Sequence, residues 1–386
     1  MSAAGDVPSS SQPTSWDSPD HDISDTLRRC LPPLTGAQHK GMTGGRIAVL
    51  GGSARYTGAP YYAAQSALRA GADLATVYCA AEAAVPIKAY SPELMVDPVY
   101  SAATFDTLLE QEADLEKGRM HGTDEEAADT VERLAEVRAE QERQLNRMVS
   151  AVIPGLDRLH CLIVGPGLGR CPLVMRATAR IVHAAKNIGL PCVIDADGLH
   201  MLTLKENNNL VRGYKGCVLT PNAIELRRLE KGFLLEDRGE DDDSRVDEGM
   251  SALVRSTEGV IVIRKGSTDE ISLVQEQPSC NLHVTMICDE RGGLKRSGGL
   301  GDILAGTVGA FSAWNYMLRK VHFQDGLRHP SEDSAKDLVL GCWSACAICR
   351  RATRRAFTRR RRGMTAPDVL EDLADTFDEM TGESMN

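Results

Sequence analysis

The chain has 386 residues, of which 42% are hydrophobic and 25% charged, and its formal net charge is −10 at pH 7. This composition is that of a soluble globular protein with a large core. The negative charge argues against a general affinity for nucleic acid or anionic membranes, and no apolar run reaches the ~20 residues that span a bilayer.

The N-terminal segment predicts a disordered tail over residues 1–30, followed by a single domain over residues 31–386. Residues 1–25 are rich in Ser, Pro and Asp, and they contain neither the apolar core of a secretory signal nor the arginines of a transit peptide. The eleven cysteines are scattered, mostly in apolar stretches. That distribution favours reduced, buried thiols in a cytoplasmic protein over a disulfide framework.

From residue 45 onward, short apolar runs alternate with helical patterns. Near-continuous Val, Ile and Leu runs are typical of strands covered on both faces, so we predict a largely parallel sheet in a three-layer α/β/α architecture. The predicted strands lie within residues 45–52, 74–80, 160–169, 191–198, 216–222 and 259–266. The predicted helices are residues 58–72, 81–89 and 172–187.

Two charged segments interrupt this alternation. Residues 110–148 favour a solvated insertion, either one long helix or a helical hairpin. A partner-binding coiled coil is less favoured, because Arg138 and Gln141 interrupt its apolar seam. Residues 236–248 are interpreted as an acidic surface loop in preference to a metal-chelating one.

The glycine-rich sequence GPGLGR follows a predicted strand and partly matches a dinucleotide-binding fingerprint. Gly165, Gly167 and Gly169 lack the final x-x-G of that fingerprint, and the next acidic residues, Asp195 and Asp197, lie too far along the chain. An NAD-dependent oxidoreductase of the Rossmann type is therefore disfavoured.

Two further strand ends carry polar residues with two interpretations each. Asn222 and Glu225 have the spacing of a helix capping box, and equally that of side chains facing a polar substrate or a hydrated metal. Lys265 and Gly266 could meet a phosphate and a flat base, or form the turn of a hairpin. Spacing alone leaves both pairs of alternatives open.

The sequence RSGGLGDILAG contains four glycines immediately before and within a predicted helix that starts near Asp302. Unpaired N–H groups at a helix start attract anions, and glycines let a phosphate approach them closely. The Lys-Ser/Thr pair of a Walker A loop is missing, and Asp302 stands where it could deprotonate an attacking hydroxyl. We favour this phosphate interpretation over the alternative, in which Asp302 only stabilises its own helix.

Cysteine and arginine runs near the C-terminus have structural interpretations that we prefer. Cys342, Cys346 and Cys349 share one helical face and are predicted to pack in the core, in preference to binding zinc. The basic run 350–363 is predicted to end a helix, in preference to acting as a targeting or nucleic-acid signal. Thr365 then caps the final helix.

These segments occur in an order that resembles the ribokinase-like superfamily. The sequences VGPGLGR, VIDADGL, LTPNAIEL and GGLGDILAG, with HKGMTGG and IKAYSPELMV before them, narrow the resemblance to the eukaryotic ATP-dependent NAD(P)H-hydrate dehydratases. It extends from about His39 to about Asp372 and excludes the two charged segments. The departures from the family pattern are the long insertion and Leu300, an apolar residue within the anion hole.

The resemblance implies a single ribokinase-like catalytic domain that repairs the S epimer of NAD(P)H hydrate. ATP, the co-substrate, would phosphorylate the C6 hydroxyl, and phosphate would leave with restoration of NAD(P)H. Mg²⁺ would bridge the ATP phosphates without an all-protein cage. The implied partners are small molecules, with neither nucleic acid nor membrane, and homo-oligomerisation is compatible with the fold.

The resemblance also assigns site residues, with Asp302 as the catalytic base and as a contact to the hydrate. The other implied substrate-binding residues are Gly167, Asn222, Ala223, Ile224, Glu225, Leu226, Arg227 and Arg228. The implied ATP-binding residues are Lys265, Gly266, Ser267, Thr268, Asp269, Gly292, Gly293, Leu294, Lys295, Arg296, Ser297, Gly298, Gly299, Leu300 and Gly301. The alternative function is a small-molecule kinase of the hydroxymethylpyrimidine or thiazole alcohol type. A non-catalytic nucleotide sensor would have no need of the Asp302 carboxylate.

Overall fold

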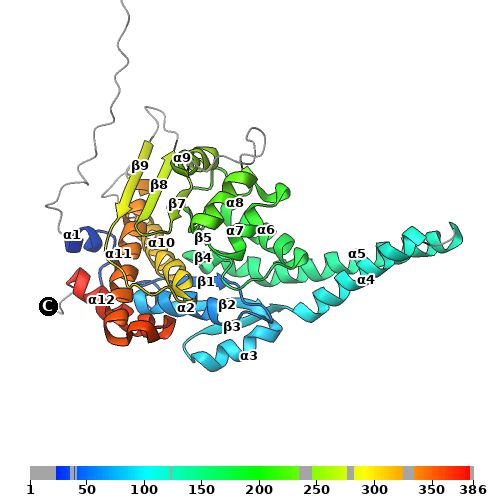
Figure 1. Ribbon diagram of the computed structural model, residues 1–386, viewed down its shortest axis with the longest axis horizontal. Helices are drawn as coiled ribbons and strands as arrows, with labels where there is room; N and C mark the ends of the chain where they lie inside the picture. The colour runs from blue at the N-terminus through cyan, green and yellow to red at the C-terminus, as the bar shows by residue number, and fades with distance from the viewer. Residues whose placement is uncertain are drawn as a thin grey trace, which may run out of the picture.

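A nine-stranded sheet forms the centre of the molecule, in the order β3-β2-β1-β4-β5-β6-β7-β8-β9 (Figure 1). The computed structural model describes residues 23–34, 39, 41–121, 124–233, 246–275, 282–324 and 334–382. The strands are β1 (Arg46–Leu50), β2 (Leu74–Ala80), β3 (Met95–Tyr100), β4 (Cys161–Val164), β5 (Cys192–Ile194), β6 (Cys217–Leu219), β7 (Ile261–Arg264), β8 (Asp269–Gln275) and β9 (Leu282–Cys288). Neighbours from β3 to β7 pair in parallel, whereas β8 and β9 are antiparallel.

Helices cover both faces of this sheet. They are α1 (Ile23–Arg28), α2 (Gly58–Ala70), α3 (Ala81–Tyr90), α4 (Ala102–His121), α5 (Asp124–Val152), α6 (Pro172–Asn187), α7 (Asp197–Leu202), α8 (Ala223–Phe233), α9 (Val246–Thr257), α10 (Leu300–Gln324), α11 (Ser334–Arg360) and α12 (Ala366–Thr381). Helices α2, α10, α11 and α12 pack against one another in one layer, and α5 to α9 pack in succession in the other. This arrangement confirms the predicted three-layer α/β/α fold with a mostly parallel sheet.

The strand predictions hold where a strand is buried on both faces. Strands β4, β5 and β6 are buried at every position, because a parallel strand between two helical layers has no solvent face. Strands β3 and β9 were not predicted, and β8 was implied only by the hairpin alternative for Lys265 and Gly266. Burial alternates along β9, which lies at the sheet edge, and β3 contains a proline and exposed positions. Neither therefore shows a continuous apolar run.

The strand order reverses direction between β1 and β4. From β1 the chain adds β2 and β3 on one side, and then crosses over to add β4, β5, β6 and β7 on the other. At such a switch point the loops after the two central strands diverge, which leaves a crevice outside their carboxyl ends. The topology therefore places a ligand site beside the loops that follow β1 and β4.

The charged insertion forms the helical hairpin α4–α5, which projects from the body of the molecule (Figure 1). The residues that interrupt its apolar seam make contacts between the two helices: Arg138 pairs with Glu112 at 2.7 Å, and the buried Gln141 donates to the Leu108 carbonyl at 3.3 Å. Leu145 is buried at the base of the hairpin. Of the two predicted forms, one long helix or a helical hairpin, the structure has the hairpin, with bounds wider than residues 110–148.

The first and last described helices, α1 and α12, pack against one another. Residues 23–30 fall within the predicted disordered tail, but they form α1 and a turn, and Leu27 is fully buried against the core. This part of the prediction is corrected, because one amphipathic turn can be anchored by tertiary packing that composition does not reveal. Residues 1–22 of the tail, and 236–245 of the acidic loop, lie outside the described residues.

The C-terminal expectations can be compared directly with α11 and α12. Cys342, Cys346 and Cys349 are free thiols buried in the core, as the packing interpretation predicts. Thr365 and Asp368 form a capping box at the start of α12. Among the helices of the described ranges, none is both long and apolar enough to cross a membrane.

Candidate active site

Four charged side chains converge near the carboxyl ends of β5, β6 and β7. Asp195 directly follows β5 and Lys265 directly follows β7, whereas Glu225 and Asp302 belong to the first turns of α8 and α10. The Lys265 ammonium lies 2.8 Å from Asp195 Oδ1 and 3.9 Å from Glu225 Oε2. A Cβ placed on Gly301, the residue before Asp302, would lie 3.5 Å from the same ammonium. We call these four residues the lysine cluster.

Burial sets the electrostatics of the lysine cluster. The side chains of Asp195 and Lys265 are only 3% and 18% exposed. Burial, and then the nearby Asp195 charge, raise the pKa of Asp302 to about 7, although Lys265 opposes this shift. Burial likewise raises the pKa of Glu225. The cluster therefore holds a carboxyl group that can accept a proton near neutral pH, as a general base requires.

The pKa of Lys265 is raised even though burial acts to lower it. Asp195 and then Glu225 stabilise the charged ammonium more strongly than desolvation penalises it, and Asp302 adds to their effect. One lysine is thus surrounded by three carboxyl groups. It remains a cation that can meet the negative charge of a phosphate.

Tight packing of two loops fixes the position of Asp195. Gly165, which follows β4, has φ +116°, and a Cβ there would lie 1.9 Å from the Asp195 carbonyl oxygen. Ala196 has φ +49°, a conformation that non-glycine residues rarely adopt. The loops after β4 and β5 therefore interlock, and only glycine fits at position 165.

Asn222 and Glu225 form the helix cap that their spacing allowed, and Glu225 also faces the cleft. Asn222 Oδ1 accepts the backbone N–H groups of Ile224 and Glu225 at 3.0 Å, and the Asn222 N–H donates to Glu225 Oε2 at 2.8 Å. This capping box opens α8. The Glu225 carboxylate also takes part in the lysine cluster, so a cap and a cleft position coexist in one side chain.

A cavity of about 800 Å³ adjoins the cluster. It is lined by Ser53, Ala54, Arg55, Tyr56, Ala59, Tyr100, Ala102, Asp106, Gly167, Leu168, Gly169, Arg170, Cys171, Val174, Ala196, Asp197 and Asp302. Gly167 and Asp302, both predicted substrate contacts, thus line one cavity. No role was predicted from the sequence for the loop from Ser53 to Ala59. Its position after central strand β1 is the signal that could have assigned it to the site.

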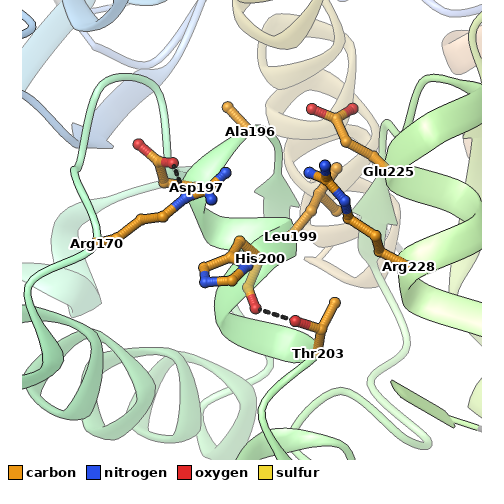
Figure 2. A pocket seen from close by; sticks show the side chains of 8 residues that line it. All are labelled: Arg170, Ala196, Asp197, Leu199, His200, Thr203, Glu225 and Arg228. Carbon is orange, nitrogen blue, oxygen red and sulfur yellow. Dashed lines mark hydrogen bonds and ion pairs between the residues drawn. The ribbon is translucent and has the colours of Figure 1, made fainter. Parts of the chain in front are cut away.

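A second cavity of about 100 Å³ shares Arg170, Ala196 and Asp197 with the first. In Figure 2 the guanidinium groups of Arg170 and Arg228 point toward one another across it. Arg170 pairs with Asp197 at 3.2 Å. The small cavity therefore presents two cations beside the lysine cluster. Glu225 belongs to the cluster and also lines this cavity.

The remaining predicted substrate residues lie along the first turns of α8. Asn222, Ala223, Ile224, Arg227 and Arg228 are exposed. The side chain of Leu226 is 1% exposed and packs in the core, so only its backbone can face a ligand. Of residues 222–228, Glu225 and Arg228 line the small cavity.

The predicted ATP segment 265–269 forms the turn between antiparallel strands β7 and β8. The hairpin interpretation of this turn is therefore confirmed, and the phosphate interpretation of Lys265 remains open beside it. The Gly266 N–H donates to Asp269 Oδ1 at 3.0 Å. Arg350 of α11 holds the Asp269 carboxylate with bonds of 2.6 and 2.8 Å, so this side chain is occupied by protein contacts.

The second predicted ATP segment, 292–301, follows β9, packs on α11 and ends in the first turn of α10. Gly293 packs on α11, where its N–H donates to Thr353 Oγ1 at 3.0 Å. Ser297 donates to the Met364 carbonyl, and Leu294 is 86% exposed. Gly299 has φ +90°, which lets the chain turn into α10 at Leu300. The end of this segment therefore lies at the lysine cluster.

Comparisons with known proteins place this geometry in a family. The family model described as NAD(P)H-hydrate dehydratase matches residues 47–117 and 119–374. The chain therefore belongs to the NAD(P)H-hydrate dehydratase family. Proteins named ATP-dependent (S)-NAD(P)H-hydrate dehydratase are 35% identical in Neurospora crassa and 33% identical in Homo sapiens. These alignments cover 92% and 93% of this chain, and 93% and 85% of those proteins.

Solved structures agree with this family at the level of the fold. A ribokinase-like superfamily protein from Enterococcus faecalis has a TM-score of 0.59 at 15% identity, covering 93% of this chain and 95% of that one. An ADP/ATP-dependent NAD(P)H-hydrate dehydratase from Bacillus subtilis, co-crystallised with ATP and Mg²⁺, has a TM-score of 0.52 at 16% identity. It covers 92% of this chain and 97% of that one. This family member thus has the ribokinase-like fold.

Proposed function

We propose that this chain catalyses the ATP-dependent dehydration of the S epimer of NAD(P)H hydrate, which returns NADH or NADPH. The name shared by relatives that cover most of its length supports this assignment. The observation that carries it is the position of Asp302. This carboxyl group has a pKa of about 7, begins α10 beside a glycine-rich segment, and lines the large cavity.

The chemistry follows from the poor leaving ability of hydroxide. The Asp302 carboxylate accepts the proton of the C6 hydroxyl, whose oxygen then bonds to the γ-phosphorus of ATP while the bond to the β–γ bridging oxygen breaks and ADP leaves. The C6–O bond next breaks with departure of inorganic phosphate. Loss of a proton from C5 completes the C5–C6 double bond. Asp302 supplies positioning and proton transfer, the two contributions that phosphoryl transfer needs from a side chain.

The ATP phosphates are assigned to the start of α10. The N–H groups of Gly299, Leu300 and Gly301 belong to the last residue before the helix and its first turn, which lack intrahelical carbonyl partners. The helix dipole favours an anion there. The Lys265 ammonium lies on the same side, close to Gly301. Lys265 would offset phosphate charge that the three carboxyl groups alone would repel.

The residues present fit a magnesium ion that arrives with ATP. Within the described ranges, no three His, Cys, Asp or Glu side chains are grouped to hold a metal ion. Carboxylate oxygens are ligands that Mg²⁺ accepts, and the ion usually keeps several waters and binds through substrate phosphates. Glu225 is the residue we assign to its water shell. When bound, the ion neutralises negative charge on the phosphates.

The two cavities are assigned to the hydrate. The large cavity, at about 800 Å³, is within the usual range for ligand pockets, and Gly167 lines it close to Asp302. Arg170 and Arg228 face one another in the adjoining small cavity. Guanidinium groups bind phosphates well, so we assign the pyrophosphate of the dinucleotide to this pair. We place the enzyme in the cytoplasm, consistent with the free, mostly buried cysteines among the described residues. Its partners are small molecules, with no role for nucleic acid or membranes. Homo-oligomerisation remains compatible with the fold.

The decisive assay follows the dihydronicotinamide absorbance after NADH hydrate and MgATP are added to the purified protein. We expect the absorbance to rise with wild type, and not to rise without ATP. Release of inorganic phosphate should match NADH formation mole for mole. A stable phosphorylated product without NADH would instead identify a small-molecule kinase and contradict the proposal.

The anion-binding glycines can be tested by Gly301→Ala, with Gly298→Ala as its matched control. A Cβ on Gly301 would make only ordinary contacts in the protein, and one on Gly298 would meet nothing within 4 Å, so both variants should fold. The methyl group at 301 would stand where we place phosphate. We expect a rise of about tenfold in the KM for ATP, equivalent to about 1.4 kcal/mol, only for Gly301→Ala. Equal KM values in the two variants would contradict this placement.

A further inference from the structure

Arg350 makes five hydrogen bonds, to the first predicted ATP segment and to the chain just before the second. Its Nε donates to Asp269 Oδ2 at 2.6 Å, and its Nη2 to Asp269 Oδ1 at 2.8 Å and to the Gly266 carbonyl at 3.0 Å. Its Nη1 donates to the carbonyls of Ser267 at 2.7 Å and Glu290 at 3.3 Å. One side chain of α11 thus joins the β7–β8 turn to the chain that leads into the glycine-rich segment.

These contacts use the whole guanidinium group. Arginine has five N–H donors, and the five bonds to Asp269, Gly266, Ser267 and Glu290 engage all of them. No donor is left for a phosphate oxygen. Arg350 is therefore suited to hold the loops and not to touch the nucleotide.

Burial gives this contact its strength. The side chains of Arg350 and Asp269 are only 11% and 8% exposed. A bidentate arginine–carboxylate pair combines charge with fixed geometry, and removing one partner of a buried pair leaves the other charge uncompensated. The hydrogen bond that Arg350 donates to Asp269 raises the pKa of Arg350, so the guanidinium stays charged.

The chain that Arg350 joins leads, at each end, to a part that the proposed function assigns to the ATP phosphates. The turn begins at Lys265, whose ammonium belongs to the lysine cluster. The other segment starts after Glu290 and ends at Gly301 beside the same ammonium. We propose that Arg350 is a positioning residue for ATP, which fixes the distance between these two segments. The inference rests on the proposed function for the identity of the nucleotide.

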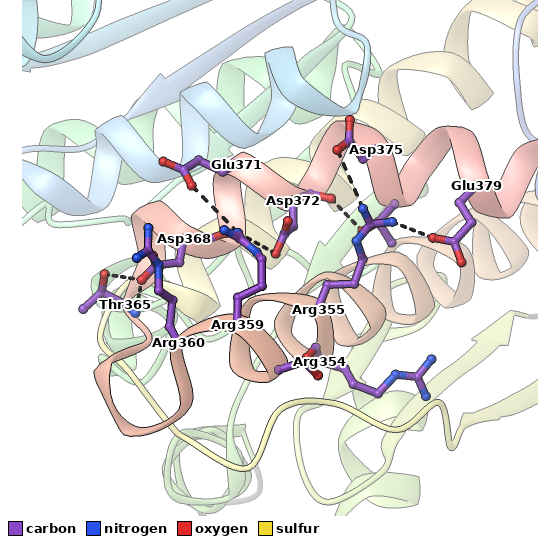
Figure 3. Close-up of polar contacts among 12 residues, drawn as sticks. Arg354, Arg355, Arg359, Arg360, Thr365, Asp368, Glu371, Asp372, Asp375 and Glu379 are labelled. Carbon is purple, nitrogen blue, oxygen red and sulfur yellow. Dashed lines mark hydrogen bonds and ion pairs between the residues drawn. The ribbon is translucent and has the colours of Figure 1, made fainter.

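Arg351 and Arg354 of α11 also pair with Glu290, at 3.0 and 3.2 Å, whereas Arg355, Arg359 and Arg360 provide a contrast. Figure 3 shows Arg355, Arg359 and Arg360 directed at acidic residues of α12, with Arg360 2.8 Å from Asp368. Their side chains are 35–54% exposed, and they are not bonded to either ATP segment. Within one basic run, Arg350 is joined to the proposed nucleotide site and these last three arginines are not. Arg355 is therefore a suitable control.

The test compares Arg350→Lys and Arg350→Met with Arg355→Met in steady-state kinetics. We expect a rise of about tenfold or more in the KM for ATP with Arg350→Met, because the loss of a charged hydrogen-bond donor commonly costs a factor of ten. The KM for NADH hydrate should stay within about twofold, because Arg350 lines neither of the cavities assigned to the hydrate. Arg350→Lys keeps the charge without the fork, so its KM for ATP should lie between wild type and Arg350→Met.

Several outcomes would overturn the inference. Equal changes in both KM values, or a rise in the KM for ATP as large in Arg355→Met, would indicate a general loss of structure. If Arg350→Met does not fold, the variants Arg350→Lys and Asp269→Asn test the proposal instead. An unchanged KM for ATP in both would contradict a positioning role for Arg350. Direct calorimetry of ATP binding separates the two proposals. If the wild-type protein binds ATP but does not dehydrate the hydrate, the proposed function is wrong. The ATP affinities of the variants would still test whether Arg350 positions the ATP site.

Discussion

The lysine cluster and the hairpin α4–α5 are both rich in charge, but their charges lie in opposite environments. Lys265 and Asp195 are 18% and 3% exposed, whereas Arg138 on the hairpin is 54% exposed although it pairs with Glu112 and Glu116 at 2.7 Å. The short distances are alike in both regions. Only in the cluster are the charges removed from water, and only there does a carboxyl group reach a pKa near 7.

The difference follows from screening. Exposed ion pairs gain little because water and salt weaken the attraction and the long side chains lose freedom. Buried charges have no such competition, so each one alters the protonation of its neighbours. The density of charge in a sequence therefore says less about function than the burial of a few charges.

The largest effect should come from removing the base itself. Asp302→Asn keeps the shape of the side chain but cannot accept a proton. We expect kcat for NADH hydrate to fall by about 10²–10⁴-fold, the usual contribution of general base catalysis. Circular dichroism should show unchanged secondary structure. Retention of most of the activity would exclude Asp302 as the base.

The same variant should also change the pH dependence of stability. The pKa of Asp302 rises from 3.8 to about 7 in the fold, so the folded state binds the proton more tightly than the unfolded chain. The stability that protonated Asp302 contributes to the folded state is full below pH 3.8 and is lost as pH rises through about 7. Asp302→Asn should therefore be more stable relative to wild type at pH 8 than at pH 5, measured by urea unfolding.

Breaking the buried pair should give the next largest effect. Lys265→Met leaves Asp195 buried without its cation, and such a loss typically costs about 3–5 kcal/mol of unfolding free energy. Urea unfolding without ATP measures it. The double variant Lys265→Met with Asp195→Asn should lose less than the sum of the two single variants. Strict additivity would mean that the two side chains do not interact.

A smaller effect is expected on the pH profile of catalysis. The rate should fall as pH drops through about 7, because Asp302 then becomes protonated. Glu225 contributes to the raised pKa of Asp302. Glu225→Gln should therefore move the acid limb of kcat/KM to lower pH. The exposed Glu206→Gln serves as control, and an equal shift in both variants would contradict the assignment.

The smallest effect should be found on the hairpin. Arg138→Ala removes two short but exposed ion pairs. We expect no measurable change in the urea midpoint or in kcat, because solvent already screens these charges. A loss comparable to that of Lys265→Met would refute the distinction between the two regions.

The sequence allowed the local parts of this molecule to be predicted. Continuous apolar runs identified the buried strands, and the glycines before Asp302 identified the start of α10, since both signals lie within about ten residues of chain. The pairing of Lys265 with Asp195 joins positions 70 residues apart. Such pairing depends on the sheet order, which no local pattern encodes.

Arg350 illustrates the same limit from another direction. It lies in a run of similar arginines, and only the packing of α11 on β8 and β9 distinguishes it from Arg355. Leu27 was likewise missed because one buried side chain in a short helix leaves no periodic signal. Tertiary contacts decide such residues, and they become visible only in the structure.

The pKa of Asp302 has one more consequence, for the coupling of nucleotide binding to protons. At neutral pH this carboxyl group is close to half ionised. A polyphosphate that binds at the start of α10 brings negative charge beside it and favours its protonated form. Each binding event would then draw protons from the buffer, and each release would return them. The buried carboxyl would thereby make nucleotide occupancy sensitive to the acidity of the surroundings.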